Sequence, residues 1–434
     1  MLRVIRTDHG LLSEMSRAEG ICMKVLMIHN SYAARSGEED AAQALADLLG
    51  ARGHDILWFR RSSAEISGSC IGNIKAFFAG IHNPFAAAAL ARRLDETRPD
   101  IVQIQNLYPL LSPAILRPIR ARGIPIVMRC PNYRLFCPTG LYLRRGRVCE
   151  QCVSRGGELW CIVHNCENSL AKSTGYAVRS MWARLTRSIV RCVDMFIVQT
   201  PFQLQKFVER GIPEARVAIV PGFVVSDRCP SWSDAADSIT FVGRVSPEKG
   251  VEDFIHAARM MPEVPFAVAG SDVTMPGIRK RSPANVRWLG FLQSDALYDT
   301  YLKSRIVVVP SRWYEGFPNV AVQAMVCARP VVAARIGALI SIVDDGRTGL
   351  HFEPGNPSDL AGKLRYLYRD PSLCRELGGN ARLKAAQYYS ADAAYRALMD
   401  AYERATDQHV QKSGFALVQS RHFPVAGAEC GGDK

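Results

Sequence analysis

Short runs of aliphatic and β-branched residues recur along the chain, and segments with helical spacing of apolar positions separate them. Continuous apolar runs bounded by turn residues are typical of strands buried on both faces. Strands that alternate with helices predict parallel, doubly wound sheets, so we expect an α/β fold. The predicted strands are residues 24–29, 55–59, 101–105, 124–128 and 195–199, and then 238–243, 266–270, 286–291, 305–310 and 330–334.

The predicted strands fall into two groups, which indicates two domains. A chain of 434 residues is longer than one hydrophobic core usually supports. Residues 223–237 are polar and contain several serines, which is typical of a linker. We therefore expect an N-terminal domain at 23–222 and a C-terminal domain at 238–390, then a terminal helix at 391–407 and a disordered tail at 408–434, which lacks periodicity.

Residues 1–22 mix charges with isolated leucines and lack the apolar core of a signal peptide. We expect them to be a non-structural extension or the result of an upstream start, because Met23 directly precedes the first predicted strand. No apolar run approaches the roughly 20 residues that span a bilayer. We expect a cytoplasmic protein, and peripheral attachment at the inner face of the cell membrane is compatible with the same sequence.

The formal charge of +13 indicates anionic partners. Nucleotide sugars, anionic lipid head groups and nucleic acid all carry the required negative charge. The chain has no helix-turn-helix, zinc-finger or RNA-binding signature, so we expect no nucleic-acid partner.

A polar turn follows the predicted strand at 305–310 and precedes a predicted helix that starts at Pro318. Open α/β sheets bind ligands in turns of this kind, and the start of a helix offers free N–H groups to an anion. Asn319 and Gln323 lie four residues apart, on one helix face. We expect Glu315, the helix start and these two amides to converge on one ligand.

This turn resembles the signature of family 4 retaining glycosyltransferases with the GT-B fold, through Glu315, Gly316, Phe317, Pro318 and Asn319 and a polar residue eight positions after the glutamate. The resemblance implies that Glu315 faces the sugar of a nucleotide-sugar donor. It implies that the turn from Gly316 to Asn319 meets the donor diphosphate and that Gln323 holds the ribose. The family usually has a second glutamate where this chain has Gln323, so the charge there differs.

A second turn, residues 243–250, also resembles the family, and the resemblance assigns Arg244 and Lys249 to a clamp on the donor diphosphate. The leaving diphosphate gains negative charge, which a fold without a catalytic metal neutralises with fixed cations. The alternative for both side chains is a solvated turn. Gly37 stands where the family has a pair of glycines that contact the donor, and no catalytic cofactor is implied.

The resemblance covers residues 23–405 and implies two Rossmann-like domains that face each other across a cleft, with the acceptor on the N-terminal side and a terminal helix that crosses back. It implies metal-independent, retaining transfer of a hexosyl group to a hydroxyl of a glycan or lipid-linked acceptor, in polysaccharide or cell-envelope glycan synthesis. Pro131, Ser341 and Gln323 depart from the family pattern. These departures keep open a nucleotide-sugar epimerase of the same fold, or a non-catalytic nucleotide-sugar-binding protein.

Residues 137–166 form a cysteine-rich insertion, of a kind that a subset of the family carries. Cys149 and Cys152 have the spacing that lets two thiolates bind one tetrahedral metal, and Cys161 and Cys166 complete a set of four. The set predicts a structural zinc site, because four protein ligands leave no open position. The alternative is a group of reduced thiols that pack a loop.

Residues 171–193 are predicted to form one amphipathic basic helix. Two interpretations are open. The helix either lies on the surface with its apolar face packed on the sheet, or it contacts an anionic membrane surface. The resemblance favours neither alone, although relatives use basic surfaces of the N-terminal domain to bind anionic membranes. The basic face comprises Lys172, Arg179, Arg184, Arg187 and Arg191, and the apolar face comprises Val178, Met181, Trp182, Leu185, Ile189 and Val193.

Overall fold

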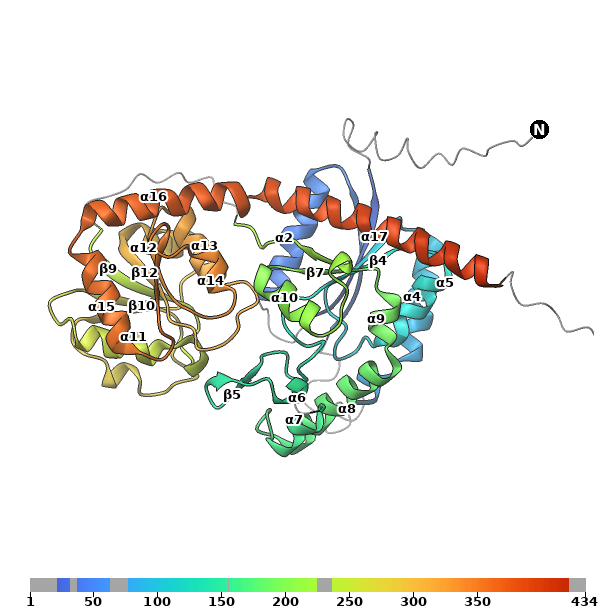
Figure 1. The fold of residues 1–434 in the computed structure, drawn as a ribbon, viewed down its shortest axis with the longest axis horizontal. Coiled ribbons are helices and arrows are strands. Elements are labelled where there is room, and N and C mark those ends of the chain that lie inside the picture. Colours follow the sequence, from blue (N-terminus) through green and yellow to red (C-terminus); the bar gives the residue numbers. More distant parts are fainter. Residues whose placement is uncertain (1–21, 32–36, 63–76, 155, 225–235, 421–434) are drawn as a thin grey trace, which may run out of the picture.

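The computed structural model describes residues 22–31, 37–62, 77–154, 156–224 and 236–420. Two six-stranded parallel sheets, each with helices on both faces, stand side by side (Figure 1). The predicted doubly wound α/β architecture is therefore confirmed. The expectations for residues 1–21, for most of the linker and for residues 421–434 lie outside the described residues.

The N-terminal sheet has the strand order β2-β1-β3-β4-β7-β8. The order reverses between β1 and β3, so a crevice is expected at the carboxyl ends of these strands. Helix α2 (Gly37–Ala51) follows β1, and α10 (Pro201–Glu209) connects β7 to β8. The strands are β1 (Lys24–Ser31), β2 (Asp55–Ser62), β3 (Ile101–Ile104), β4 (Ile126–Arg129), β7 (Met195–Val198) and β8 (Val217–Ile219), and α4 (Pro84–Thr97) and α5 (Leu116–Ala121) are further helices.

The C-terminal sheet has the order β11-β10-β9-β12-β13-β14, with the reversal between β9 and β12. Strand β14 was not among the predicted strands, because its four residues include His351 and interrupt the apolar pattern. The strands are β9 (Ser238–Val242), β10 (Phe266–Ala269), β11 (Val286–Gly290), β12 (Ser304–Val309), β13 (Val331–Ala334) and β14 (Gly349–Phe352), and the helices are α11 (Val251–Arg259), α12 (Ser294–Lys303), α13 (Asn319–Val326), α14 (Leu339–Ile342), α15 (Pro357–Tyr368) and α16 (Pro371–Tyr388).

The cysteine-rich insertion and the helices after it project from the N-terminal domain, below the sheet in Figure 1. A short hairpin, β5 (Leu143–Arg144) and β6 (Arg147–Val148), leads into α6 (Gln151–Ser154), α7 (Leu159–Val163), α8 (Leu170–Thr186) and α9 (Ser188–Cys192). The prediction of one helix over 171–193 was wrong, since Arg187 adopts a left-handed backbone with φ of 50° between α8 and α9.

The faces of this helical pair also differ from the prediction. Arg179, placed on the basic face, is buried, while Trp182 and Leu185, placed on the apolar face, are 50% and 64% exposed. The guanidinium of Arg179 stacks over the rings of Tyr108 and Tyr176, which explains how a cation is accommodated there. The apolar face of α8 is thus not wholly packed against the sheet.

The last helix, α17 (Ala391–Ser420), begins beside the C-terminal domain and runs along the N-terminal sheet (Figure 1). It continues through residues 408–420, where a disordered tail was expected. Its buried Tyr402 donates a hydrogen bond to Gln103 of β3, and His409 and Lys412 contact the buried carboxylate of Asp194. The helix predicted at 391–407 thus continues further, and the contacts of His409 and Lys412 stabilise the part that the sequence does not indicate.

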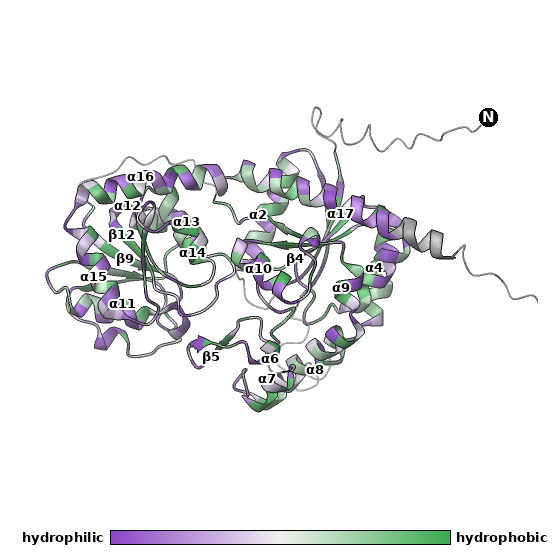
Figure 2. Ribbon diagram, viewed as in Figure 1, coloured by the Kyte–Doolittle hydropathy of each residue, from purple (hydrophilic) through white to green (hydrophobic). Residues whose placement is uncertain are grey.

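Hydrophobic positions concentrate on the strands and on the helix faces that cover them, as Figure 2 shows. Within the ranges that the structure describes, no helix combines the length and the apolar character needed to cross a bilayer.

Candidate functional site

The two turns singled out in the sequence meet at the carboxyl ends of β9 and β12. Lys249 Nζ lies 2.8 Å from Glu315 Oε2, and Ser311 donates its hydroxyl to Glu315 Oε1. Glu315 is 6% exposed, so its carboxylate is held by partners rather than by bulk water. β9 and β12 are neighbours at the point where the strand order reverses, which is where open sheets bind ligands.

The backbone at Gly250 allows the first turn to lie against the end of β12. Its φ is +71°, and a Cβ atom there would stand 1.8 Å from the carbonyl oxygen of Pro310. Only glycine fits both conditions. This close approach brings Lys249, one residue earlier, within reach of Glu315.

A second ion pair fixes the same two turns. The guanidinium of Arg312 contacts both carboxylate oxygens of Asp253, which is 1% exposed, and the backbone N–H of Arg312 donates to the carbonyl of Glu248 at 2.8 Å. Asp253 was not predicted from the sequence, because its only signal is an acidic residue in the first turn of the helix after Gly250. The pair orients the turn that carries Glu315.

Arg244 does not join this cluster. Its side chain is 68% exposed and pairs with Glu248 at 3.2 Å, within its own turn. No hydrogen bond or ion pair between Arg244 and Glu315 exists among the described residues. Of the two predicted clamp cations, the structure therefore brings only Lys249 to the glutamate.

The residues after Glu315 have separate surroundings. Pro318 precedes α13, Asn319 is exposed at its first position, and Gln323 accepts a hydrogen bond from Tyr301 Oη at 2.9 Å. Phe317 packs against Gly222 and lies 5.7 Å from the ring of Tyr389. Gly37 is the exposed first residue of α2, and nothing lies within 4 Å of the position a Cβ atom would take there.

Gly316 joins the turn to the N-terminal domain. A Cβ atom on Gly316 would stand 2.1 Å from the carbonyl oxygen of Pro131, so the two backbones are in direct contact. On the other side of Glu315, Tyr314 lies 4.7 Å from the ring of Phe202 and 6.3 Å from that of Tyr142. Tyr142 belongs to the cysteine-rich insertion, which therefore packs beside the Glu315 turn.

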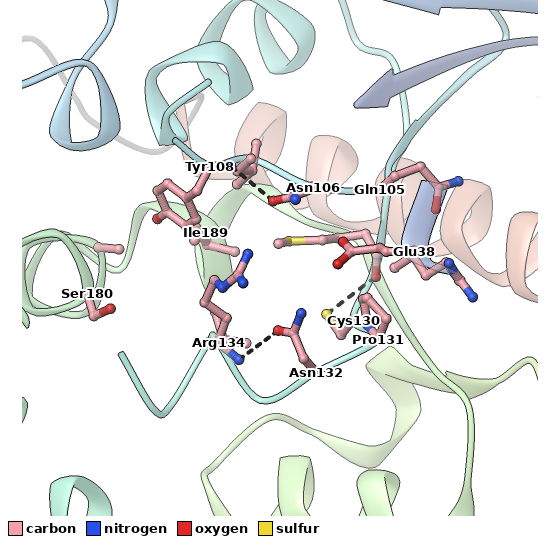
Figure 3. Close-up of a pocket in the computed structure, with 15 residues that line it drawn as sticks. Glu38, Gln105, Asn106, Tyr108, Cys130, Pro131, Asn132, Arg134, Ser180 and Ile189 are labelled. Atoms are coloured by element: carbon pink, nitrogen blue, oxygen red, sulfur yellow. Dashed lines mark hydrogen bonds between the residues drawn. The ribbon is translucent and has the colours of Figure 1, made fainter. Parts of the chain in front are cut away.

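Pro131 also lines a pocket in the N-terminal domain, drawn in Figure 3. In this view Gln105, Glu38 and Cys130 lie on one side, and Tyr108, Ile189 and Ser180 lie on the other. The carbonyl of Cys130 accepts a hydrogen bond from Gln203 of α10 at 3.3 Å, which holds this edge of the pocket. Pro131 thus belongs both to the lining of this pocket and to the contact with the Glu315 turn.

Buried polar residues lie near the carboxyl ends of the strands next to this pocket. Burial lowers the pKa of Arg129 and of His29, and it raises the pKa of the Cys130 thiol to about 12. Arg129 and Gln105, which line this pocket, were not predicted from the sequence. Their signal was a polar residue at the carboxyl end of an apolar run, which many solvated strand ends share.

The four thiols predicted to bind zinc lie near one another. Burial and the neighbouring Cys137, Cys166 and Cys149 raise the pKa of Cys152 to about 12, and a hydrogen bond with Cys161 lowers the pKa of Cys166 to about 7. Nevertheless, in the part of the chain that the structure describes, no group of three or more His, Cys, Asp or Glu side chains is arranged to hold a metal ion. The zinc site stays a prediction.

Two family models match the chain. One described as "Glycosyl transferases group 1" matches residues 232–384, which include both turns, and one described as "Glycosyl transferase 4-like domain" matches residues 36–222.

Individual relatives agree with these models. The D-inositol 3-phosphate glycosyltransferase of Mycolicibacterium vanbaalenii is 30% identical over 255 residues, which are 51% of this chain and 56% of the relative. This chain spans about half the length of the curated relatives it matches.

Solved structures agree on the fold. Sucrose-phosphate synthase from Thermosynechococcus elongatus superposes with a TM-score of 0.63 at 17% identity, over 88% of this chain and 98% of that one. Anabaena HepE, solved with UDP and glucose, gives 0.62 at 17% identity, over 88% and 99%. At this identity the two structures establish the arrangement of domains and nothing finer.

Proposed function

This chain belongs to the group 1 glycosyltransferases and has their two-domain GT-B fold, and on that premise we propose that it is a retaining, metal-independent glycosyltransferase. It would move a hexosyl group from a nucleotide-sugar donor to a hydroxyl of a glycan or lipid-linked acceptor. A role in polysaccharide or cell-envelope glycan synthesis, at the inner face of the cell membrane, is part of the same proposal.

The observation that carries the proposal is the ion pair between Lys249 and Glu315 at the switch point of the C-terminal sheet. A lysine ammonium has three donors, and Glu315 takes one, so two are available to a diphosphate. Growing negative charge on a leaving diphosphate is stabilised by a fixed cation that is already in place. The carboxylate of Glu315, beside that cation, would stabilise positive charge on the donor sugar.

Arg244 would bind the diphosphate once its ion pair with Glu248 is broken. Exposed ion pairs contribute little to stability, so exchange of a carboxylate for a phosphate costs little at this position. Asn319 and the free N–H groups at the start of α13 would support the same phosphate. Gln323, with its amide held by Tyr301, would bind the ribose.

The projecting helices favour contact with an anionic membrane as an additional property. Trp182 and Leu185 are exposed on α8, and Arg184, Arg187 and Arg191 are exposed close to them in sequence. Exposed aromatic and aliphatic groups next to arginines are typical of surfaces that lie in a lipid head-group region. Arg184 is partly engaged, because it donates to both oxygens of Glu158.

A zinc ion at the cysteine set would have a structural role. The ligands would be Cys149, Cys152, Cys161 and Cys166, which come from one segment, and the backbone N–H of Cys149 donates a hydrogen bond to the carbonyl of Tyr142. Zinc would hold this segment against the Glu315 turn without taking part in transfer.

The test of the proposal is a screen of nucleotide sugars by thermal shift, since a ligand that binds only the folded chain raises its melting temperature. The best donor is then incubated alone and with candidate acceptors, and the products are separated. Transfer that requires an acceptor supports the proposal. A changed donor sugar without any acceptor would identify an epimerase, and binding without turnover would identify a non-catalytic protein.

A further inference from the structure

The cysteine-rich insertion reaches the C-terminal domain at the residue before Glu315. Its hairpin, labelled β5, extends toward that domain in Figure 1, and the ring centres of Tyr142 and Tyr314 lie 6.3 Å apart. We propose that the insertion and α10 form an interdomain latch that positions Glu315. In this latch, Glu150 fixes Lys206 over the ring of Tyr314. The contact itself depends on no reaction, whereas its effect on sugar transfer rests on the proposed function.

Tyr314 is the part of the latch that the C-terminal domain contributes. Its ring packs edge to face against three rings of the N-terminal domain, whose centres lie 4.7, 6.3 and 6.4 Å away and belong to Phe202, Tyr142 and Tyr133. Edge-to-face contact is an arrangement that aromatic pairs prefer. Tyr133 and Tyr142 are each 1% exposed, so their own positions are fixed by packing. The ring of Tyr314 therefore has a defined position against the opposite domain.

Glu150 joins the insertion to α10. Its two carboxylate oxygens accept hydrogen bonds from Lys206 Nζ at 2.8 Å and from Arg210 Nη2 at 2.7 Å. The three side chains are 23%, 13% and 19% exposed, so the ion pairs are shielded from most of the solvent. Hydrogen bonds between charged groups are short and strong, and they fix the geometry of both partners. The carboxylate of Glu150 thus holds the ammonium of Lys206 in one place.

Lys206 carries this constraint to the aromatic part of the latch. Its Nζ lies 5.6 Å from the ring centre of Tyr314 and 5.6 Å from that of Phe202, within the range of a cation–π contact. Burial raises the pKa of the Tyr314 hydroxyl, and the nearby negative charge of Glu150 raises it further. The ring of Tyr314 is therefore in contact with the cation and close to the carboxylate that fixes it.

The latch acts on Glu315 because Glu315 directly follows Tyr314. Tyr133 donates its hydroxyl to the carbonyl oxygen of Glu315 at 3.5 Å. On the other side, a Cβ atom on Gly316 would stand 2.1 Å from the carbonyl oxygen of Pro131. The N-terminal domain therefore contacts Glu315 itself and the residues before and after it. A misplacement of about 1 Å can lower the rate of a catalysed reaction about 100-fold, so a loosened latch should lower turnover.

The experiment measures hydrogen–deuterium exchange in the full chain by mass spectrometry. Exchange reports local opening, so residues 311–317 report the Glu315 turn and β10 reports the core of the same domain. Glu150→Gln keeps the size of the side chain, removes its charge and lies in the other domain. It should raise exchange of residues 311–317 by about tenfold or more, because charge-assisted hydrogen bonds are lost, and it should leave β10 unchanged.

Three further variants complete the test. Lys206→Met breaks the same link and should act as Glu150→Gln does, whereas Tyr314→Phe should have a smaller effect because the ring contacts remain. Glu214→Gln, an exposed glutamate of the N-terminal domain, is the matched control and should change nothing. If Glu150→Gln raises exchange throughout the chain, its fold is lost and Lys206→Met decides the question. Unchanged exchange of residues 311–317 in either folded variant would overturn the inference.

Turnover separates the latch from the proposed reaction. With the nucleotide sugar selected by the thermal screen, Glu150→Gln should lower turnover about tenfold while the donor dissociation constant stays within about threefold, because displacement of reacting groups costs rate more than affinity. Faster exchange of the turn with full turnover would overturn the positioning role while transfer stands. If the parent chain transfers no sugar, the proposed function fails, and the exchange results alone decide whether the latch exists.

Discussion

At the residue scale, the structure explains how glutamine replaces the family's usual glutamate at position 323. Gln323 Oε1 accepts a hydrogen bond from Tyr301, whose side chain is fully buried. Burial raises the pKa of Tyr301 well above its usual value, so the hydroxyl stays protonated and always donates. The position therefore needs an acceptor oxygen and does not need a charge.

Gln323→Glu should consequently be tolerated. A glutamate is close in size and still accepts the Tyr301 hydrogen bond, so the donor dissociation constant should stay within about threefold of the parent value. Isothermal titration with the donor found in the thermal screen checks this. A tenfold loss of affinity would show that the position has to be neutral.

Some residues of the candidate site could be predicted from the sequence, and others could not. Glu315 and Lys249 were predictable because each lies in a turn whose local sequence carries a signature. Gln105 was not, because its buried amide has no hydrogen-bond partner among the described residues, and that depends on residues distant in sequence. Arg244 was assigned to the clamp by resemblance, although its side chain pairs with Glu248 in the structure.

At the scale of single elements, α8 and α9 show how a helical pattern can mislead. The basic and apolar faces predicted for one helix over 171–193 do not take account of the break at Arg187. Helical spacing alone also cannot predict that Arg179 stacks on aromatic rings. The exposed residues of this helical pair include the apolar Trp182 and Leu185 and the basic Arg187 and Arg191, and they form the mixed exposed surface of α8 and its junction with α9.

Binding to anionic vesicles should depend on both parts of this surface. Replacing Arg184, Arg187 and Arg191 with Gln should weaken binding severalfold at low salt and reduce its salt dependence, because charges at a lipid surface act within a Debye length. Trp182→Ala should weaken binding at every salt concentration. Vesicle sedimentation measures both, and equal binding by parent and triple variant would identify an ordinary solvated surface.

The cysteine-rich insertion makes its own prediction. Purified chain should contain about one zinc ion by elemental analysis, and Cys149→Ser should lower that content because a ligand is lost. In metal-free chain, the pKa of about 7 makes Cys166 roughly half thiolate at pH 7, so its alkylation by iodoacetamide should rise through that pH. Fully folded, metal-free protein would show that the thiols only pack.

At the scale of the whole molecule, α17 ties the two domains together. Asp194 at the start of β7 is fully buried, and its carboxylate contacts Arg120, His409 and Lys412. The strands were predictable because apolar runs mark them wherever they occur. The continuation of α17 beyond residue 407 was not, since Gln408, His409 and Lys412 contact residues of the N-terminal domain that are distant in sequence.

The double change His409→Ala and Lys412→Ala should therefore destabilise the chain. Losing two partners of a buried carboxylate should cost about 1 to 3 kcal/mol of unfolding free energy, because Arg120 and a backbone N–H remain. Thermal or urea unfolding measures it, with the exposed neighbour Gln411→Ala as control. Equal stability of parent and double variant would mean that this end of α17 is not held by Asp194.

The domain contact at Gly316 and Pro131 places the two sites of the molecule next to each other. We propose that the donor binds around Glu315 and Lys249, and the pocket that Pro131 lines lies in the N-terminal domain, on the proposed acceptor side. Transfer between them is the central claim, and Glu315 is the residue on which it depends most.

The most direct test is the turnover and donor affinity of Glu315→Gln, measured with the donor from the thermal screen. Loss of one electrostatic stabiliser should lower turnover by roughly 100-fold or more while the donor dissociation constant changes only a few-fold. Lys249→Ala should impair both, because the ammonium meets the diphosphate before and during transfer. The control Glu403→Gln, an exposed glutamate on α17, should keep both values. Undiminished turnover in a folded Glu315→Gln variant would contradict the account.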